Sequence, residues 1–441
     1  MQKKFLRNLF FSLVIMALLM FFDELPWVMK IENTGMDLVM ELNQGIIPPL
    51  SEKNIPAFVL VDINDETYHA WGEPLFTPRN HLTNLIKVAV EKKAAMVIVG
   101  IDVSQPTPVV GSQLHPDDLA LKNYLKNYVT ECNNTKSKCP PIILVRAFQT
   151  VPNLIPVPRT GFLEELVAQS APLLQWSSAG FLQSDDAVVR RWELWQPTCT
   201  SDKQPQVIPS IELLVMAEVK GCTDELQQKL NRFLPQNCDT EYQPPSDSVK
   251  ELCGLPSIST NVRNIDQRIL YTMPWSADKQ QPWGLQTESP EPEMALMVCS
   301  ALNVIGSEPN KDCLAQLENS MVVIGGSYRD GSALHSTPLG DMPGSLVITN
   351  AIHSILQYGT IQLPPTWVNL LIYILLIIVI SFLFALGLNT FLGLVLSILF
   401  VIVPALALSY YSLIHYNIWF DFARLLVGLE LYHIFFGCEG K

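Results

Sequence analysis

The sequence is short of basic residues. It contains 29 Lys and Arg against 42 Asp and Glu, which gives a formal net charge of −13. A phosphate backbone is bound by clustered Lys and Arg, and the sequence has no such cluster. Nucleic acid is therefore excluded as a predicted partner.

Motifs for catalysis and metal binding are also missing. There is no C-x-x-C pair, no P-loop or dinucleotide spacing, and no G-x-S-x-G nucleophile elbow. Ser327, Asp330 and His335 can be nominated for hydrolysis, but nothing in the sequence brings them into contact. We predict no catalytic residue, no enzyme activity, no metal and no cofactor.

The N-terminus has an apolar run from Leu9 to Phe22 that follows Lys3, Lys4 and Arg7. Bulky side chains stand where a signal peptidase requires small ones, so we expect an uncleaved transmembrane anchor over residues 1–24 rather than a cleaved signal sequence. Basic residues stay in the cytoplasm. The segment after the anchor, residues 25–362, is then predicted to be extracytoplasmic.

Two more apolar runs lie near the C-terminus, over residues 363–387 and 390–412. Each is long enough to cross a hydrocarbon core of ~30 Å at ~1.5 Å per residue. A third run, residues 416–437, is predicted to cross as well, which places residues 438–441 in the cytoplasm. The alternative for this third run is an amphipathic helix that lies on the membrane surface.

The third run carries charged and titratable side chains, which are costly in lipid and usually face protein. Asp421 and Arg424 are three residues apart, as are Glu430 and His433, so each pair shares a helix face. We interpret these four residues as the candidate interface with another membrane protein.

Eight of the nine cysteines lie between Cys132 and Cys313, within the predicted extracytoplasmic domain. The even number indicates disulfides. Cys132 with Cys139, and Cys238 with Cys253, bracket polar stretches that short bridges would close, although eight thiols permit 105 pairings. A zinc site and unpaired buried thiols are the alternatives. The full set of disulfide candidates is Cys132, Cys139, Cys199, Cys222, Cys238, Cys253, Cys299 and Cys313.

The central domain alternates apolar strands with helices, which indicates one α/β domain with a mixed sheet. A strand at 57–63, a helix from Thr77 to Lys93 and a strand at 95–103 predict a βαβ unit with parallel pairing. Further strands are expected at 142–148, 179–182 paired with 188–194, 269–273 and 321–324. Further helices are expected at 211–219, 292–302 and 345–356.

Acidic residues follow the first two strands: Asp62, Asp65 and Glu66 after one, and Asp102 after the other. If these strands are neighbours, the carboxylates meet at the edge where open α/β sheets bind ligands. The favoured alternative is that Asp62 and Asp102 accept backbone N–H bonds in turns. Likewise, we interpret Gly325-Gly326-Ser327 as a turn rather than an anion cradle.

Several segments, in order, resemble the CHASE domain of the second type. They are Val61 to Glu66, Pro78-Arg79, Val99 to Val103, Gly180 to Arg191, Ile208 to Ile211, Val323 to Ser327, Thr337 to Gly344, and Asn350 to Ile352. The resemblance covers roughly residues 25 to 360, and the family usually has one helix before the domain and three after it. The cysteine-bearing insertions at 104–140 and 222–262 depart from the family pattern.

The resemblance implies an extracytoplasmic sensor of the kind found on bacterial adenylate cyclases and kinases, in the bacterial inner membrane. Because residues 438–441 leave no room for an output domain in this sequence, we expect the signal to pass to a separate membrane or signalling protein. The alternative is a structural subunit of a larger inner-membrane complex that senses nothing. Both interpretations imply the lipid bilayer and a homo- or hetero-oligomeric partner.

Overall fold

The computed structural model describes most of the chain: residues 2–21, 26–43, 55–109, 113–135, 139–149, 155–200, 202–239, 249, 251–256, 258–259, 265–275, 296–328, 334–386 and 390–436. The chain forms two compact units. Residues 52–360 make one unit, and residues 1–51 with 361–441 make the other. Each unit is described below by itself.

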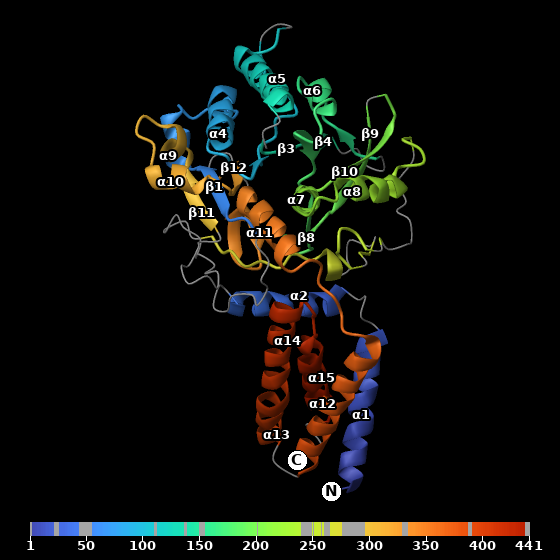
Figure 1. Ribbon diagram of the computed structural model, residues 1–441. Coiled ribbons are helices and arrows are strands. Elements are labelled where there is room, and N and C mark those ends of the chain that lie inside the picture. The colour runs from blue at the N-terminus through green and yellow to red at the C-terminus, as the bar shows by residue number, and fades with distance from the viewer. Residues whose placement is uncertain are drawn as a thin grey trace. The chain divides into compact units, whose positions relative to one another are not determined.

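The larger unit is built on a six-stranded sheet with the order β11-β1-β12-β2-β3-β6 (Figure 1). Its strands are β1 Phe58–Ile63, β2 Met96–Val99, β3 Ile142–Val145, β6 Leu174–Ser177, β11 Leu296–Ser300 and β12 Met321–Gly326. Every pairing among them is parallel. The predicted α/β class is confirmed, but the predicted mixed sheet is wrong for this sheet.

The antiparallel pairs of the described chain are short and separate from the central sheet. They are β4 Phe148–Gln149 with β5 Val157–Pro158, β7 Phe181–Gln183 with β8 Val189–Trp192, β9 Trp195–Cys199 with β10 Pro205–Pro209, and β13 Leu334–Thr337 with β14 Gly340–Pro343. The β7–β8 hairpin confirms its prediction. Its turn is closed by a bond from the Ser184 amide to the Val188 carbonyl, 3.0 Å.

Helices cover both faces of the sheet because alternate strand residues point to opposite sides. Val59 and Val61 face one apolar core, together with helices α4 Arg79–Glu91, α5 Pro116–Thr135, α6 Glu164–Ala168, α9 Ala301–Ile305 and α10 Lys311–Gln316. Phe58 faces the other side, where its ring contacts His353 of α11 Gly344–Gln357. Helix α7 Ile211–Lys220 packs against α11. The unit also contains the short helices α3 Asp65–Ala70 and α8 Thr223–Leu230 and the 3-10 helices Asn231–Phe233 and Ile265–Gln267.

Two predicted elements are wrong. Residues 296–300 of the predicted helix 292–302 form strand β11, and only Ala301–Ile305 is helical, while residues 292–295 lie outside the described part. Residues 269–273 form no strand. Asn350 of α11 replaces a strand partner there, since its Oδ1 accepts the amides of Thr272 and Met273 at 3.0 and 2.9 Å.

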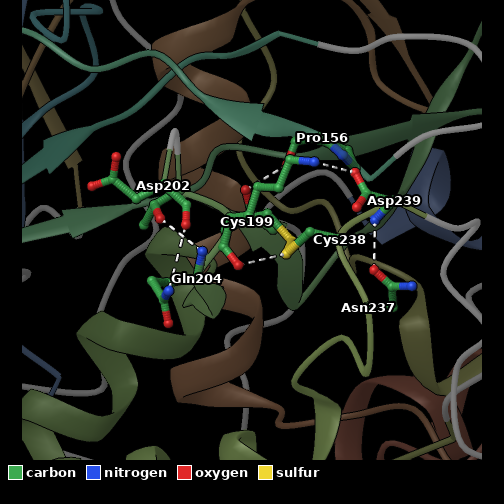
Figure 2. The surroundings of a disulfide bond; sticks show 10 residues. Pro156, Cys199, Asp202, Gln204, Asn237, Cys238 and Asp239 are labelled. Carbon is green, nitrogen blue, oxygen red and sulfur yellow. Dashed lines mark hydrogen bonds and ion pairs between the residues drawn. A yellow bond between two sulfur atoms is a disulfide. The ribbon is translucent and has the colours of Figure 1, made fainter.

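All eight cysteines of the larger unit form disulfides, as predicted. The pairs are Cys132–Cys139, Cys199–Cys238, Cys222–Cys253 and Cys299–Cys313. The expected bridge across Cys132 and Cys139 is confirmed, but the one across Cys238 and Cys253 is wrong. Figure 2 shows that Cys238 instead joins Cys199, at the end of β9, beside a bond from the Asp239 amide to the Asn237 side chain.

The smaller unit is helical: α1 Gln2–Phe21, α2 Pro26–Asn43, α12 Thr366–Ala385, α13 Thr390–Ser397, a π-helical segment Ile398–Ile402, α14 Val403–Tyr416 and α15 Phe422–Phe436. Two of the described helices are long and apolar enough to cross a membrane, Thr366–Ala385 and Val395–Tyr416. The π-helical segment ends two residues before Pro404, whose ring removes one backbone donor from the helix.

Candidate functional site

Asp62 lies at the end of β1 and is 3% exposed. Its Oδ2 accepts a hydrogen bond of 2.6 Å from the Ser327 hydroxyl, and its Oδ1 is buried without a hydrogen-bond partner among the described residues. Burial raises the pKa of Asp62 to about 6, against the lowering effect of the Ser327 hydroxyl, and nearby Asp65 adds to the rise. Asp62 is therefore a buried carboxyl held by Ser327, whose backbone amide as well as its hydroxyl opposes the rise in pKa.

The predicted cluster of four carboxylates does not assemble across the two strands, although Asp65 lies near enough to Asp62 to raise its pKa. Strand β12 lies between β1 and β2 in the sheet, so Asp62 and Asp102 do not follow neighbouring strands. Two strand spacings separate these strands, about 10 Å. Asp65 and Glu66 lie in the first turn of α3, where the helix dipole stabilises acidic side chains.

Asp102 instead closes a turn. Its Oδ1 accepts the backbone amide of Ser104 at 2.9 Å and the hydroxyl of Ser104 at 2.6 Å, which is the structural role expected as the alternative. Buried Arg79 holds the same loop by donating to the Asp102 carbonyl at 3.1 Å, and its Nε lies 3.5 Å from Asp118. These contacts hold the loop after β2 in place.

A cavity of about 520 Å³ opens at the carboxyl edge of the sheet. Its floor is made by the ends of the three central strands and the residues that follow them, including Ile63, Gly100 and Gly326. The β7–β8 hairpin contributes an apolar wall with Phe181 and Leu182. The volume and the position at the strand ends are typical of small-molecule sites in open α/β sheets.

The N-terminus of α11 forms the polar side of this cavity. Gly344 and Ser345, its first two residues, line the cavity, and no side chain caps the helix there. The first backbone N–H groups of a helix have no partner within the helix and carry a partial positive charge. Ser345 is 5% exposed, and its hydroxyl has no hydrogen-bond partner among the described residues.

Two glycines of β12 allow the start of α11 and the Tyr328 ring to approach the strand closely. A Cβ on Gly325 would lie 2.4 Å from the Cβ of Ser345, and a Cβ on Gly326 would lie 2.9 Å from the ring of Tyr328. Both glycines belong to β12, so the predicted turn at Gly325-Gly326-Ser327 is wrong for its first two residues. The strand continues because Gly325 and Gly326 keep pairing with β1.

His335 also lines the cavity, from β13, and burial lowers its pKa. Its Nε2 would lie 3.2 Å from a Cβ on Gly344, at the start of α11. The Ser327 hydroxyl is committed to Asp62 rather than to His335, and Asp330 lies outside the described residues. In the described part of the chain, no group of three or more His, Cys, Asp or Glu side chains is placed to hold a metal ion.

The candidate partner residues lie in the helical unit. Arg424 Nε is 2.6 Å from Asp421 Oδ2, which confirms the expected pairing, and Asp421 Oδ1 accepts the amides of Ala423 and Arg424 at the start of α15. Arg424 Nη2 also lies 3.5 Å from Glu32 of α2, a partner that sequence reasoning missed. The side chains of Glu430 and His433 lie outside the described residues.

Sequence reasoning also missed the role of Ser345. The available signal was the segment Thr337 to Gly344, which ends where α11 begins. The predicted helix 345–356 already includes this serine, but only the packing of α11 on β12 places it at the cavity.

Comparison with known proteins agrees with this architecture. The model of the CHASE2 domain family matches residues 11–386. The chain therefore belongs to the CHASE2 domain family, a family of extracytoplasmic sensor modules. No curated protein and no solved structure matches the chain.

Proposed function

We propose that this protein is a membrane-anchored extracytoplasmic sensor that binds a small solute and acts through a separate partner protein, without catalysis of its own. The observation that carries the proposal is the cavity of about 520 Å³ at the carboxyl edge of the sheet. Membership of the CHASE2 family supports the sensory role.

Chain connectivity supports a route for the signal. Helix α11 lines the cavity with its first turn, and residues 358–365 connect its C-terminal end to α12. Ser345 to Gln357 are all buried, so α11 is packed on every side. A ligand that shifts α11 therefore changes the packing of the residues around it. Closely packed helices move between separate conformations rather than by continuous deformation.

The helical unit is proposed to cross the inner membrane with the N-terminus in the cytoplasm. Helix α12 has 20 residues, enough for a core of ~30 Å, whereas α15 has 15 residues, about 22 Å at ~1.5 Å per residue. A third crossing by residues 416–437 thus requires residues on either side of α15. The ionic group of Glu32, Asp421 and Arg424 is proposed as the contact for a membrane partner.

The test is affinity purification of the full-length chain from its native membrane in a mild detergent, followed by quantitative mass spectrometry. A sensor is expected to retain a kinase, a cyclase or another regulator at less than stoichiometric amounts. A fixed stoichiometric set of membrane subunits, with no signalling protein, overturns the sensor in favour of the structural subunit.

A further inference from the structure

Helix α2 lies across one end of the helical unit (Figure 1). Near its middle, a Cβ on Gly35 would lie 2.8 Å from the Cβ of Ala423, at the start of α15. At its last residue, Asn43 Oδ1 accepts a hydrogen bond of 3.1 Å from the Tyr410 hydroxyl of α14. Residues 417–421 join the end of α14 to the start of α15, so α2 contacts both helices at the same end of the bundle.

Exposed aromatic side chains lie at this same end. Trp367 is the second residue of α12 and Tyr416 the last residue of α14, and both are exposed. The starts of α12 and α15 are held together here, because the Trp419 amide donates to the Gln362 carbonyl at 2.8 Å. Tryptophan and tyrosine are enriched where a membrane meets water. These aromatic residues indicate that α2 lies at the level of a membrane surface.

The inward face of α2 is fixed to the bundle. Met36, Val39 and Met40 are fully buried. On the same face, Glu32 Oε2 lies 3.5 Å from Arg424 Nη2 of α15. Together with the close approach of Gly35 to Ala423, these contacts determine which side of α2 faces outward.

An apolar strip runs along the outward side of α2. Trp27, Leu38 and Leu42 are 47%, 40% and 44% exposed. At ~3.6 residues per turn, these three side chains lie within about 60° of one another around the helix axis. Large apolar side chains exposed along one line of a helix indicate contact with a lipid or with another protein.

A polar strip runs beside the apolar one. It consists of Lys30, Thr34 and Glu41, which are all exposed and lie within about 40° of one another at ~3.6 residues per turn. A helix surrounded by water gains nothing from the apolar strip, and a helix within the hydrocarbon core does not tolerate the polar strip. Two such strips side by side are typical of a helix at the boundary between acyl chains and water.

We propose that α2 is an interfacial helix, which lies in the extracytoplasmic surface of the membrane with Trp27, Leu38 and Leu42 against lipid acyl chains and the polar strip toward water. The inference rests on the proposed membrane crossing of the helical unit. Because Gly35 and Glu32 hold α2 to the start of α15, the lipid contact of α2 fixes the depth of α15 in the bilayer.

The test is spin-label accessibility of the full-length chain in lipid nanodiscs. Eight of the nine cysteines are disulfide-bonded, so Cys438→Ser provides a background without a free thiol. Single labels at Leu38→Cys and Leu42→Cys are compared with labels at Thr34→Cys and Glu41→Cys on the polar strip. Oxygen partitions into lipid, and a nickel chelate stays in water.

Labels on the apolar strip are expected to show an oxygen-to-nickel accessibility ratio about threefold or more above that of the polar strip, because the apolar side of an interfacial helix enters the acyl boundary by roughly 5–10 Å. Equal ratios on the two strips place the apolar strip in water and overturn the inference. Low accessibility of Leu38 and Leu42 to both reagents shows that protein covers the strip, which also overturns it.

A matched pair of variants tests the cause. In the chain labelled at Leu42→Cys, Leu38→Glu is expected to lower the oxygen accessibility of the label by about twofold, because a carboxylate is costly at the acyl boundary. Thr34→Glu, on the polar strip, is expected to leave it unchanged. The same response to both variants, or no response to Leu38→Glu, contradicts contact of Leu38 with lipid.

A label in the middle of α12 separates this inference from the proposed membrane crossing. Leu375 is 56% exposed and is expected to be reached by oxygen but not by the nickel chelate. Access of the nickel chelate to Leu375 contradicts the crossing itself. A Leu375 label in lipid, combined with Leu38 and Leu42 labels in water, overturns the interfacial helix alone.

Discussion

Gly325 of β12 packs against Ser345 of α11 so closely that a Cβ on Gly325 would lie 2.4 Å from the Cβ of Ser345. Gly325 is also the register partner of Asp62 in β1. The contact sets the first turn of α11 directly on the strand end, and it thereby shapes the polar side of the cavity.

Gly325→Ala is expected to destabilise the larger unit by about 1–3 kcal/mol, because the added methyl group forces α11 away from the sheet. Gly100→Ala is the control at the same edge of the sheet, where the nearest atom to a Cβ, the Ile324 carbonyl oxygen, is 3.2 Å away. Denaturant unfolding of the full-length chain in nanodiscs measures both. A Gly100→Ala loss as large as that of Gly325→Ala contradicts the assigned contact.

Asp62→Asn is expected to stabilise the fold at pH 8 and to leave it unchanged near pH 4. Burial raises the pKa of Asp62 from 3.8 to about 6, so the folded state disfavours the ionised form. The resulting cost is absent below the unfolded pKa of 3.8, grows as the pH rises, and is complete above about 6. Its upper limit is about 3 kcal/mol for a shift of about two pH units.

Unfolding midpoints of Asp62→Asn and wild type at pH 4, 6 and 8 test this dependence. The asparagine keeps one oxygen that accepts from the Ser327 hydroxyl and replaces the other oxygen by an amide NH2, so the variant removes the charge with little change in volume. The exposed Asp202 provides a surface control in Asp202→Asn, which is expected to change stability by less than about 0.5 kcal/mol. A pH-independent difference for Asp62→Asn would count against the burial of a charge.

Asn350→Ala is expected to destabilise the larger unit by about 3 kcal/mol or more. Asn350 is fully buried, and its loss leaves the amides of Thr272 and Met273 without their acceptor. Each buried unpaired amide costs about 1–3 kcal/mol. Asn303→Ala, on the exposed side of α9, is the matched control and should change stability by less than about 0.5 kcal/mol. Similar losses in both variants would refute the role of Asn350.

The loss of stability on removal of a disulfide is expected to increase with the length of the loop that the disulfide closes. Cys199–Cys238 closes a sequence separation of 39 and Cys132–Cys139 one of 7. By the chain-entropy relation their removal costs about 4 and about 2.5 kcal/mol, respectively. Double Cys→Ala variants of each pair, compared by denaturant unfolding under oxidising conditions, test the order. A larger loss for the Cys132–Cys139 pair would be the opposite result.

Alkylation of intact cells gives an independent check on these bridges. Most of the eight cysteines of the larger unit are expected to remain unlabelled unless a reductant is added first, because they are disulfide-bonded. Extensive labelling without reductant would contradict an oxidised domain.

Arg424→Leu is expected to reduce co-purification of the membrane partner by about tenfold, with little change in the unfolding midpoint of the larger unit. The substitution leaves Asp421 and Glu32 without their shared cation. The double variant Asp421→Leu with Arg424→Leu removes both charges of the closer pair. If the single variant loses the partner because Asp421 is left unpaired, the double variant should recover part of the co-purification. If Arg424 contacts the partner directly, the double variant should not recover it. Full partner recovery in the single variant would exclude this interface.

Local composition was enough to locate many of the elements. Helix α12 and the helix that ends at Tyr416 were predicted from apolar runs. A membrane-length apolar run can be identified from its own length and composition, without knowledge of distant contacts. Strand β1, helix α4 and the β7–β8 hairpin were also found where their side-chain periods placed them. The oxidised cysteines followed from their number and position.

The order of strands and the identity of distant partners were decided by the tertiary structure. The pattern of apolar residues along a strand indicates which of its faces are buried, but it does not indicate which strand lies beside it. The position of β12 between β1 and β2 was therefore not predicted. The same holds for Cys199 with Cys238 and for Arg424 with Glu32, whose chain segments are far apart. Ser345 became a cavity residue only because α11 packs on Gly325, a contact that depends on three-dimensional packing rather than on local sequence.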